Sequence, residues 1–450
     1  MLQPKVFKAY DVRGIYGVDW DASGAALITR SFIEQFDLKQ IVLGWDMRVS
    51  SLEMVAAIES AAVAAGVRVV KVGLVTTPVL YFATAGYAGN DGGIMVTASH
   101  NTGEWNGMKL LLGNGMPVGE ASGLLEIKER ALQGEFIDAA TAGSIETHEV
   151  LEDCFDKVFS IISLDPTKPI SVVIDCGNGM EGAVIHRLLA RLPMIAAHVM
   201  YDTPDGTFPH HEANPLKSET LVDLEKEVVA RGAMMGIAFD GDGDRVGFVD
   251  ERGHEVSADV LVALVARELL TTHAGACVLY DLRMRRAAAR AIVAAGGVAV
   301  MSRVGHAFIK KQMRELDALF AGELSCHFYF RDFFSVECAD AMMLCVLKLL
   351  QTTGKPLSEL AREFLTDVHS GEINFEVHDR QGALELLEVT YGARAHSVSK
   401  MDGLLFDMGD WWFNVRPSNT EPLLRLNLET QTVAMTEEKV NEIRKLITSL

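Results

Sequence analysis

The segment Gly93–Lys109 contains the residues best suited to nucleophilic chemistry. An apolar run ends at Val96 and gives way abruptly to a polar, glycine-punctuated stretch. The end of such a strand is where α/β proteins place reactive side chains. Ser99 is the candidate nucleophile. Because an unassisted serine hydroxyl is a poor nucleophile, it needs a base or a metal nearby, and His100 lies beside it and Lys109 ten residues further on. A serine that caps a helix is the competing interpretation, and the G-x-S-x-G elbow of acyl-transfer hydrolases is absent.

The segment Gly236–Arg245 carries three carboxylates at alternate positions, Asp240, Asp242 and Asp244. Intervening glycines let the backbone curl, so that the three carboxylates can converge on one hard cation. An EF-hand loop is a competing interpretation, but its sixth position needs glycine and is Arg245 here. A metal-free Asp/Gly turn is a second competing interpretation. Three oxygen ligands with room for a phosphate favour Mg²⁺.

Two further segments offer groups for binding a sugar phosphate. The loop Arg416–Pro422, with Arg425 downstream, combines guanidinium, hydroxyl, amide and backbone N–H groups, which together suit a phosphate, although a solvated turn would look the same. Glu323 and Ser325 lie two residues apart and face the same way if extended, so they could hold adjacent sugar hydroxyls. A zinc site at Cys326-His327 fits no common spacing.

The turn Gly177–Gly182 matches the dinucleotide-binding pattern G-x-G-x-x-G, and Asp202 follows at the distance of a ribose-binding acid. Taken alone, this segment predicts a dehydrogenase. That interpretation leaves the Ser99 and Asp240 segments without a function, and we therefore disfavour it.

Buried strands followed by an aspartate, a turn and a helical stretch recur along the chain, at residues 41–46, 170–175 and 276–281. Continuous apolar strands that alternate with helices predict α/β layers. The helix after the first strand is predicted over 51–65, closed by Gly66. From about residue 370, short strands at 404–406, 411–415 and 423–428 predict an antiparallel sheet, with a helix from about 437.

Composition and charge exclude several classes of function. The chain has 450 residues and a formal net charge of -20, with no polybasic block, so neither nucleic acid nor a membrane is an expected partner. The amino-terminal residues contain no signal-like apolar region, and the six cysteines form no CxxC pair, which favours a cytoplasmic protein with reduced thiols.

These motifs, in this order, resemble the α-D-phosphohexomutases, and among them the bacterial phosphomannomutases and phosphomannomutase/phosphoglucomutases. The similarity runs from Phe7–Gly14 to the Arg416 loop and so covers nearly the whole chain. It implies three similar α/β domains with mixed sheets plus a C-terminal α+β domain around a central cleft. The expected domains are residues 1–148 with the phosphoserine loop, 149–250 with the metal loop, 251–367 with the sugar loop and 368–450 with the phosphate loop.

The resemblance also assigns roles to matching residues. It implies Ser99, His100, Lys109 and Arg245 as catalytic, and Ser99, Asp240, Asp242 and Asp244 as ligands of Mg²⁺. It implies the following contacts to the substrate: Tyr10, Arg13, Arg283, Gly305, His306, Glu323, Ser325, His327, Arg416, Ser418, Asn419, Thr420 and Arg425.

Three positions depart from the family pattern. Thr102 stands where proline is usual, Cys326 where glycine or alanine is usual, and Arg283 where some relatives have lysine. The first change implies a looser loop, and the second implies a tighter sugar pocket.

The implied activity is that of an intramolecular phosphotransferase of the phosphomannomutase type. It would interconvert mannose 6-phosphate and mannose 1-phosphate through a phosphoserine and a hexose 1,6-bisphosphate, which also serves as activator, and would feed GDP-mannose and polysaccharide synthesis. Phosphoglucomutase, dual-specificity or phosphoglucosamine mutase activity shares the same chemistry. A phosphatase, which would release phosphate to water, and a non-catalytic sugar-phosphate sensor are competing hypotheses. The expected partner is a small sugar phosphate, and the protein is expected to be a monomer or a homodimer.

Overall fold

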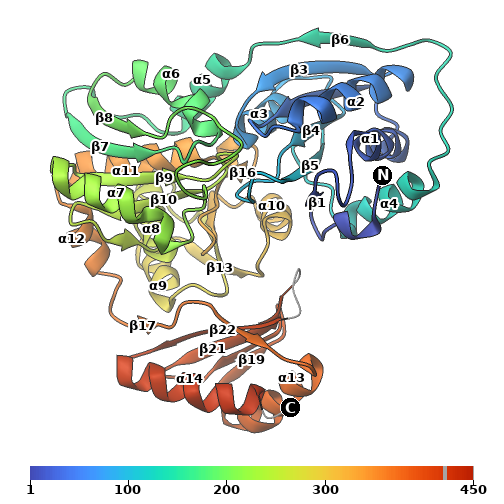
Figure 1. Ribbon diagram of the computed structural model, residues 1–450. Coiled ribbons are helices and arrows are strands. Elements are labelled where there is room, and N and C mark those ends of the chain that lie inside the picture. The colour runs from blue at the N-terminus through green and yellow to red at the C-terminus, as the bar shows by residue number, and fades with distance from the viewer. Residues whose placement is uncertain (419–422, 449–450) are drawn as a thin grey trace. The chain divides into compact units, whose positions relative to one another are not determined.

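The computed structural model describes residues 1–418 and 423–448 (Figure 1). The chain divides into two compact parts. The first consists of Met1–Val256 and Ser325–Ser358, and the second of Ser257–Leu324 and the residues from Glu359 onward. Each part has a hydrophobic core of its own, and each is described separately below.

The first part opens with a six-stranded mixed sheet in the order β1-β5-β4-β2-β3-β6. Its strands are β1 (Val12–Ile15), β2 (Gln40–Trp45), β3 (Arg68–Leu74), β4 (Gly92–Val96), β5 (Trp105–Leu112) and β6 (Ser144–Thr147), and its helices are α1 (Ala22–Phe36), α2 (Ser51–Ala64), α3 (Thr77–Gly86) and α4 (Leu124–Gln133). The parallel strands β2 and β4 are almost wholly apolar because both faces of the sheet are covered. Strand β5 returns antiparallel to β4, so the loop between them carries Ser99 at the carboxyl end of β4. The predicted helix over 51–65 is confirmed, and Gly66 follows it with φ +78°.

A second mixed sheet in the first part has the order β11-β10-β9-β7-β8. It contains β7 (Ile170–Asp175), β8 (Ile195–Met200), β9 (Met235–Phe239), β10 (Val246–Asp250) and β11 (Glu255–Val256), with α5 (Leu151–Ile161), α6 (Ile185–Ala190) and α7 (Ser218–Arg231). Strands β9 and β10 form an antiparallel pair in which Phe239 is the partner of Val246. The turn between these two residues therefore holds all three aspartates of the predicted metal loop. The first part also includes β15 (Phe328–Phe330), β16 (Val336–Glu337) and α11 (Ala339–Thr353).

The second part contains three parallel strands in the order β13-β12-β14. They are β12 (Cys277–Asp281), β13 (Val298–Ser302) and β14 (Phe320–Gly322), accompanied by α8 (Ala258–Leu270), α9 (Arg286–Ala294) and α10 (His306–Glu315). The short helix α12 (Leu357–Arg362) crosses the division between the two parts. Strand β12 ends at Asp281, which confirms the third predicted strand and places this carboxylate at its carboxyl end.

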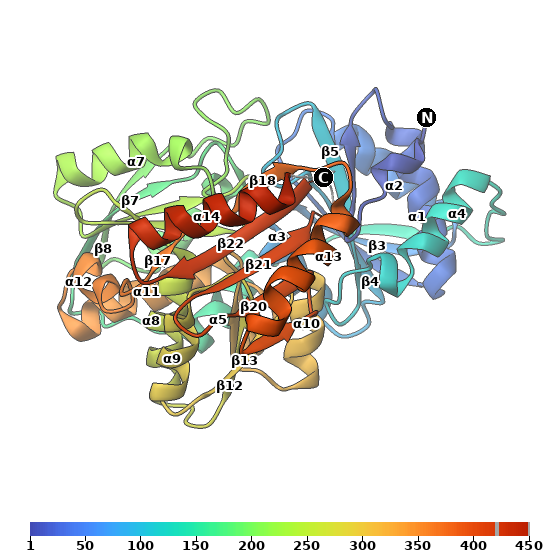
Figure 2. The same ribbon diagram turned by 90° about the horizontal axis from the view of Figure 1, so that it is seen from below.

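The C-terminal residues form an antiparallel sheet with two helices on one face (Figure 2). Its strands are β17 (Val368–His369), β18 (Ile373–Glu376), β19 (Ser397–Ser399), β20 (Leu404–Asp407), β21 (Trp412–Pro417) and β22 (Leu423–Thr430), and its helices are α13 (Arg380–Tyr391) and α14 (Val433–Ile447). Helix α14 begins four residues earlier than predicted, because the Thr432 side chain accepts a hydrogen bond from the Met435 N–H and so caps the helix. Three α/β domains and a C-terminal α+β domain confirm the predicted fold class.

No helix of residues 1–418 and 423–448 combines the length and the apolar character needed to cross a bilayer.

Candidate active site

Ser99 lies in the loop between β4 and β5 with its backbone in the left-handed region, at φ +52°. Its hydroxyl donates a hydrogen bond of 2.9 Å to Asp240 Oδ2, and His100 Nδ1 lies 3.2 Å from the same Oγ atom. The side chain is 2% exposed. The next regular element is strand β5, not a helix, so the helix-cap interpretation of Ser99 is wrong. The sharp turn instead directs the serine hydroxyl toward the first aspartate of the metal loop.

Arg48, which the sequence analysis did not single out, supports the backbone of the serine loop. Its guanidinium donates hydrogen bonds of 2.6 to 2.9 Å to the carbonyl oxygens of Ser99, Asn101, Thr102 and Trp105. A salt bridge of 3.0 Å joins its Nε to Asp46, and both side chains are fully buried. The position of Asp46 directly after a predicted strand was the available signal, because a buried carboxylate there needs a cationic partner.

The three predicted metal ligands lie close together. Each of Asp240, Asp242 and Asp244 is buried and offers a carboxylate oxygen within 4.8 Å of the others. Among the described residues, Oδ1 of Asp242 is buried without a hydrogen-bond partner, and Oδ1 of Asp244 has only a long contact of 3.4 Å to His327 Nε2. The loop is flanked by two strands, which excludes the helix–loop–helix EF-hand. Poorly satisfied oxygens in a cluster of hard ligands fit a divalent cation.

Lys109 supplies positive charge to this cluster. Its Nζ donates hydrogen bonds of 2.7 Å to Asp242 and 2.5 Å to Asp244. Burial would lower the pKa of the lysine, but the two carboxylates outweigh it and raise that pKa. Burial, followed by repulsion from Asp244 and Asp242, raises the pKa of Asp240 well above its usual value. Lys109 and the Arg245 guanidinium, whose Nε lies 3.9 Å from Asp240 and 4.0 Å from Asp244, supply two positive charges for three carboxylates, as expected of a site that takes a cation.

Cationic and imidazole groups surround the serine. Burial, followed by the charges of Arg245 and Arg13, holds the pKa of His100 well below its usual value, so this imidazole is neutral at neutral pH. Arg245 donates through Nε to His327 Nε2 at 3.1 Å, and the same nitrogen of His327 lies 3.4 Å from Asp244. Burial opposes the ionisation of Asp244, but Lys109, His327 and Arg245 lower its pKa well below its usual value.

Further predicted contacts lie in the first part of the chain. Arg13 on β1 donates a hydrogen bond of 2.8 Å to the Asn101 side chain in the serine loop. The Ser325 hydroxyl lies 3.1 Å from His327 Nδ1, on the side opposite to Arg245. Tyr10 is half-buried in the bend that precedes β1. The structure thus gathers Ser99, the three aspartates, Lys109, Arg245 and His327 into one connected polar network.

The departures from the family pattern have local explanations. Thr102 donates through its hydroxyl to Glu104 at 2.8 Å, and its carbonyl accepts from Arg48, so the loop is fixed without a proline. Cys326 has φ +64°, a conformation in which glycine is least strained. Backbone geometry therefore explains why glycine suits position 326, but it does not explain alanine there.

In the second part, Glu323 is buried at the end of β14 and accepts a hydrogen bond of 3.0 Å from the Gly305 N–H. Gly305 has φ +127°, so its conformation is accessible to few other residues. His306 begins α10, and its Nδ1 lies 3.5 Å from Lys310 Nζ. Glu323, one of the two residues predicted to contact sugar hydroxyls, therefore connects its own loop to the loop that carries Gly305 and His306.

A cluster of three arginines in the second part contains the residues predicted to hold phosphate. Arg283, Arg416 and Arg425 surround the carboxylate of Glu372, which sequence reasoning missed because nothing local marks it. Burial opposes its ionisation, but the three guanidinium groups lower the pKa of Glu372. Ser418 is buried, and its N–H donates to the Leu423 carbonyl at 2.9 Å. Asn419 and Thr420 lie outside the described residues.

The glycines of Gly177–Gly182 have a packing role. A Cβ atom at Gly179 would lie 2.9 Å from the Asp240 carbonyl oxygen, and one at Gly182 would lie 2.1 Å from that of Asp202. The Met180 N–H donates to the Gly241 carbonyl at 2.9 Å. The G-x-G-x-x-G pattern here therefore lets a turn approach the metal loop closely.

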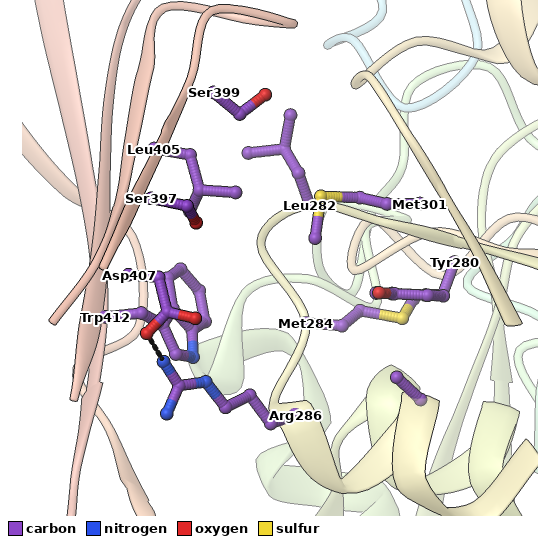
Figure 3. A pocket seen from close by; sticks show the side chains of 11 residues that line it. Tyr280, Leu282, Met284, Arg286, Met301, Ser397, Ser399, Leu405, Asp407 and Trp412 are labelled. Carbon is purple, nitrogen blue, oxygen red and sulfur yellow. Dashed lines mark hydrogen bonds and ion pairs between the residues drawn. The ribbon is translucent and has the colours of Figure 1, made fainter. Parts of the chain in front are cut away.

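A mainly apolar cavity of about 230 Å³ lies within the second part (Figure 3). At one side Arg286 forms a salt bridge of 2.7 Å with Asp407. The cavity is lined by Tyr280, Leu282, Met284, Arg286, Ala289, Met301, Ser397, Ser399, Leu405, Asp407 and Trp412. It contains none of the predicted site residues, so it is separate from the candidate active site.

Comparisons with known proteins identify the family of the chain. Residues 4–138, 152–253 and 257–368 match models of phosphoglucomutase/phosphomannomutase alpha/beta/alpha domains I, II and III, and residues 372–446 match the C-terminal domain. The chain is 39% identical to a phosphomannomutase of Salmonella montevideo, over 98% of this chain and 99% of the relative. It is 37% identical to a phosphomannomutase of Methanocaldococcus jannaschii, over 99% and 98%. A crystal structure of a phosphoglucomutase/phosphomannomutase family protein from Burkholderia thailandensis is 31% identical and covers 100% of this chain and 98% of its own, with a TM-score of 0.91. The chain therefore belongs to the phosphoglucomutase/phosphomannomutase family of intramolecular phosphotransferases.

Proposed function

We propose that this chain is a phosphomannomutase that interconverts mannose 6-phosphate and mannose 1-phosphate through phosphorylated Ser99 and a hexose 1,6-bisphosphate. The observation that carries the proposal is the Ser99 hydroxyl, 2.9 Å from one of three clustered aspartates, of which Lys109 bridges the other two. The phosphomannomutases that resemble the chain over nearly its full length support the choice of sugar.

In the first step, the bond between Ser99 Oγ and phosphorus breaks while a bond forms between phosphorus and a free sugar hydroxyl oxygen. The hydroxyl proton must leave, and the serine oxygen must gain one. His100 is placed to pass that proton to the serine oxygen, because its Nδ1 lies 3.2 Å from Ser99 Oγ. The bisphosphate then turns round and returns its other phosphoryl group to Ser99.

Phosphoryl transfer needs charge neutralisation and in-line positioning more than covalent assistance. Lys109 donates to Asp244, and Arg245 Nε lies 3.9 Å from the Asp240 oxygen that accepts from Ser99, so both would offset negative charge on the transferring group. A Mg²⁺ ion held by Asp240, Asp242, Asp244 and a phosphoserine oxygen would add charge neutralisation. Glu323 and Ser325 would contact the sugar hydroxyls. Arg283, Arg416, Ser418, Asn419, Thr420 and Arg425 would hold the phosphate that is not transferred.

The test is a coupled assay on purified protein with Mg²⁺ and a trace of hexose 1,6-bisphosphate, with mannose 1-phosphate and glucose 1-phosphate supplied separately. Mannose 1-phosphate should be converted to the 6-phosphate, and Ser99→Ala should abolish conversion while Ser160→Ala, an exposed serine on α5, leaves it unchanged. Near-normal turnover by Ser99→Ala, or release of inorganic phosphate in place of the mutase product, would refute the proposal. The same assay tests glucose phosphate as a second substrate, which the family description includes.

A further inference from the structure

The carboxylate of Glu372 occupies the centre of the arginine cluster. Its Oε2 lies 2.9 Å from Arg416 Nη2 and 3.5 Å from Arg283 Nη1, and its Oε1 lies 3.0 Å from Arg425 Nη1. Both oxygens of one carboxylate thus contact guanidinium groups that come from three different segments. Such forks of N–H groups suit a phosphate equally well.

The arginines are held in place by contacts other than Glu372. Asp281, which is fully buried, accepts hydrogen bonds from Arg283 Nε at 3.1 Å and from Nη2 at 2.7 Å. Arg416 and Arg425 are direct partners on the antiparallel strands β21 and β22. The cluster therefore keeps its geometry from the sheet and from Asp281, while Glu372 adds an anion at its centre.

Glu372 and Arg425 form the accessible side of the cluster. Their side chains are 23% and 22% exposed, whereas those of Arg416 and Arg283 are 3% and 8% exposed. Glu372 stands at the entrance to β18, directly after Gly371 with φ +68°. The carboxylate is thus on the solvent-accessible side of the cluster, where an incoming anion would meet it.

Glu372 holds the N–H groups that an incoming phosphate would need. Its two oxygens contact guanidinium nitrogens of Arg416, Arg283 and Arg425. A phosphate that approached these nitrogens while Glu372 stayed would meet a carboxylate of like charge, whereas one that replaced Glu372 would not. Phosphate and Glu372 therefore compete for the same guanidinium N–H groups.

We propose that Glu372 is an exchangeable anion of the phosphate clamp, where the clamp denotes Arg283, Arg416 and Arg425. It occupies the clamp when phosphate is absent and weakens the hold on phosphate when it is present. The inference rests on the proposed function, in which the bisphosphate must leave the clamp once per cycle to turn round. A clamp of three arginines without a competing carboxylate would retain the phosphate and slow that step.

The test compares Glu372→Gln, which keeps the size and removes the charge, with the matched control Glu376→Gln, at an exposed glutamate on the strand β18 that follows Glu372. Calorimetric titration with inorganic phosphate should show about three- to tenfold tighter binding for Glu372→Gln only, as expected for one partly exposed charged hydrogen-bonding partner. The gain should disappear in the double variant with Arg416→Lys, which locates it in the clamp. The kcat for mannose 1-phosphate should fall by a similar factor, and the KM for this substrate should fall as well.

Unchanged or weaker phosphate binding by Glu372→Gln would overturn the inference and would leave Glu372 a residue that only positions the arginines. Glu372→Asp keeps the charge and should show no gain in affinity, so an equal gain in both variants would also overturn it. The phosphate titration needs no turnover. A wild-type protein that converts no hexose phosphate would refute the proposed function, and the titration would still decide the role of Glu372.

Discussion

Arg48 donates a hydrogen bond of 2.8 Å to the carbonyl oxygen of Ser99 and so connects the end of β2 to the backbone of the proposed nucleophile. Three other carbonyl groups of the same loop accept from this guanidinium. Because Ser99 has a positive φ, its backbone needs such external contacts to hold the conformation.

Arg48→Lys should preserve the positive charge but lose most of these hydrogen bonds, because an ammonium has three donors and no planar fork. We expect kcat to fall by about 10²-fold from misplacement of Ser99. The free energy of unfolding should fall by roughly 2–4 kcal/mol, since buried carbonyl groups lose their donors. Turnover and denaturant unfolding measure the two effects. Arg231→Lys, which disturbs a surface ion pair with Glu227, should leave both unchanged; equal effects of the two variants would contradict the role of Arg48.

Lys109→Gln should separate turnover from metal affinity. In the wild type, Lys109 donates to carboxylate oxygens of Asp242 and Asp244. Removal of its charge therefore leaves these two carboxylates less neutralised, which favours binding of a cation. We expect Mg²⁺ to bind more tightly, by about tenfold, while turnover falls by about 10²-fold or more because the transferring phosphoryl group loses a charge partner. Calorimetric titration with Mg²⁺ and the coupled assay measure these changes. Lys226→Gln on the exposed face of α7 is the control, and weaker Mg²⁺ binding by Lys109→Gln would argue against competition.

A buried pair of carboxyl groups gives stability a specific pH dependence. Glu181, next to the metal loop, and Asp340 on α11 share a hydrogen bond, and burial raises the pKa of Asp340 to about 6 and that of Glu181 well above its usual value. Groups with raised folded-state pKa values stabilise the fold fully below their unfolded values near 4. For Asp340 this contribution is lost as pH rises through about 6, and for Glu181 as pH rises through its raised pKa, at up to about 1.4 kcal/mol per pH unit for each proton.

Glu181→Gln should remove part of this dependence, because the amide can donate to Asp340 without a titrating proton. The free energy of unfolding of the variant, relative to that of wild type, should therefore be higher at pH 8 than at pH 5. Urea unfolding at both pH values measures this difference. Glu152→Gln, at an exposed position on α5, makes the same change in charge and is the control. Parallel pH profiles for wild type and Glu181→Gln would show that the pair holds no shared proton.

Arg286 links α9 to the C-terminal sheet within the second part, as Figure 3 shows for its salt bridge with Asp407. Its backbone N–H also donates to Glu429 at 2.9 Å. Asp407→Asn should lower the free energy of unfolding by less than about 1 kcal/mol, since the pair is partly exposed. Arg286→Ala should cost more, because the guanidinium also donates to the carbonyl oxygens of Gly409 and Trp411. Thermal unfolding of both variants, with Asp410→Asn as the exposed control, tests this order.

The sequence by itself determined the local features of the protein. Alternation of apolar strands and helices predicted the α/β layers, and abrupt polar turns after Val96 and Phe239 located the serine and the aspartates. These signals are local because strand burial and turn chemistry act over a few residues. Spacing by two residues placed the three aspartates on one turn without any knowledge of the fold.

Tertiary structure decided which of these residues meet. Ser99 and Asp240 are 141 positions apart, and only the packing of two sheets in the first part brings them within hydrogen-bond distance. Arg48 and Glu372 were not predicted, because a buried charge is evident only through partners from distant segments. The physical reason is that electrostatic pairing depends on distance and burial in space, which the order of residues along the chain does not fix.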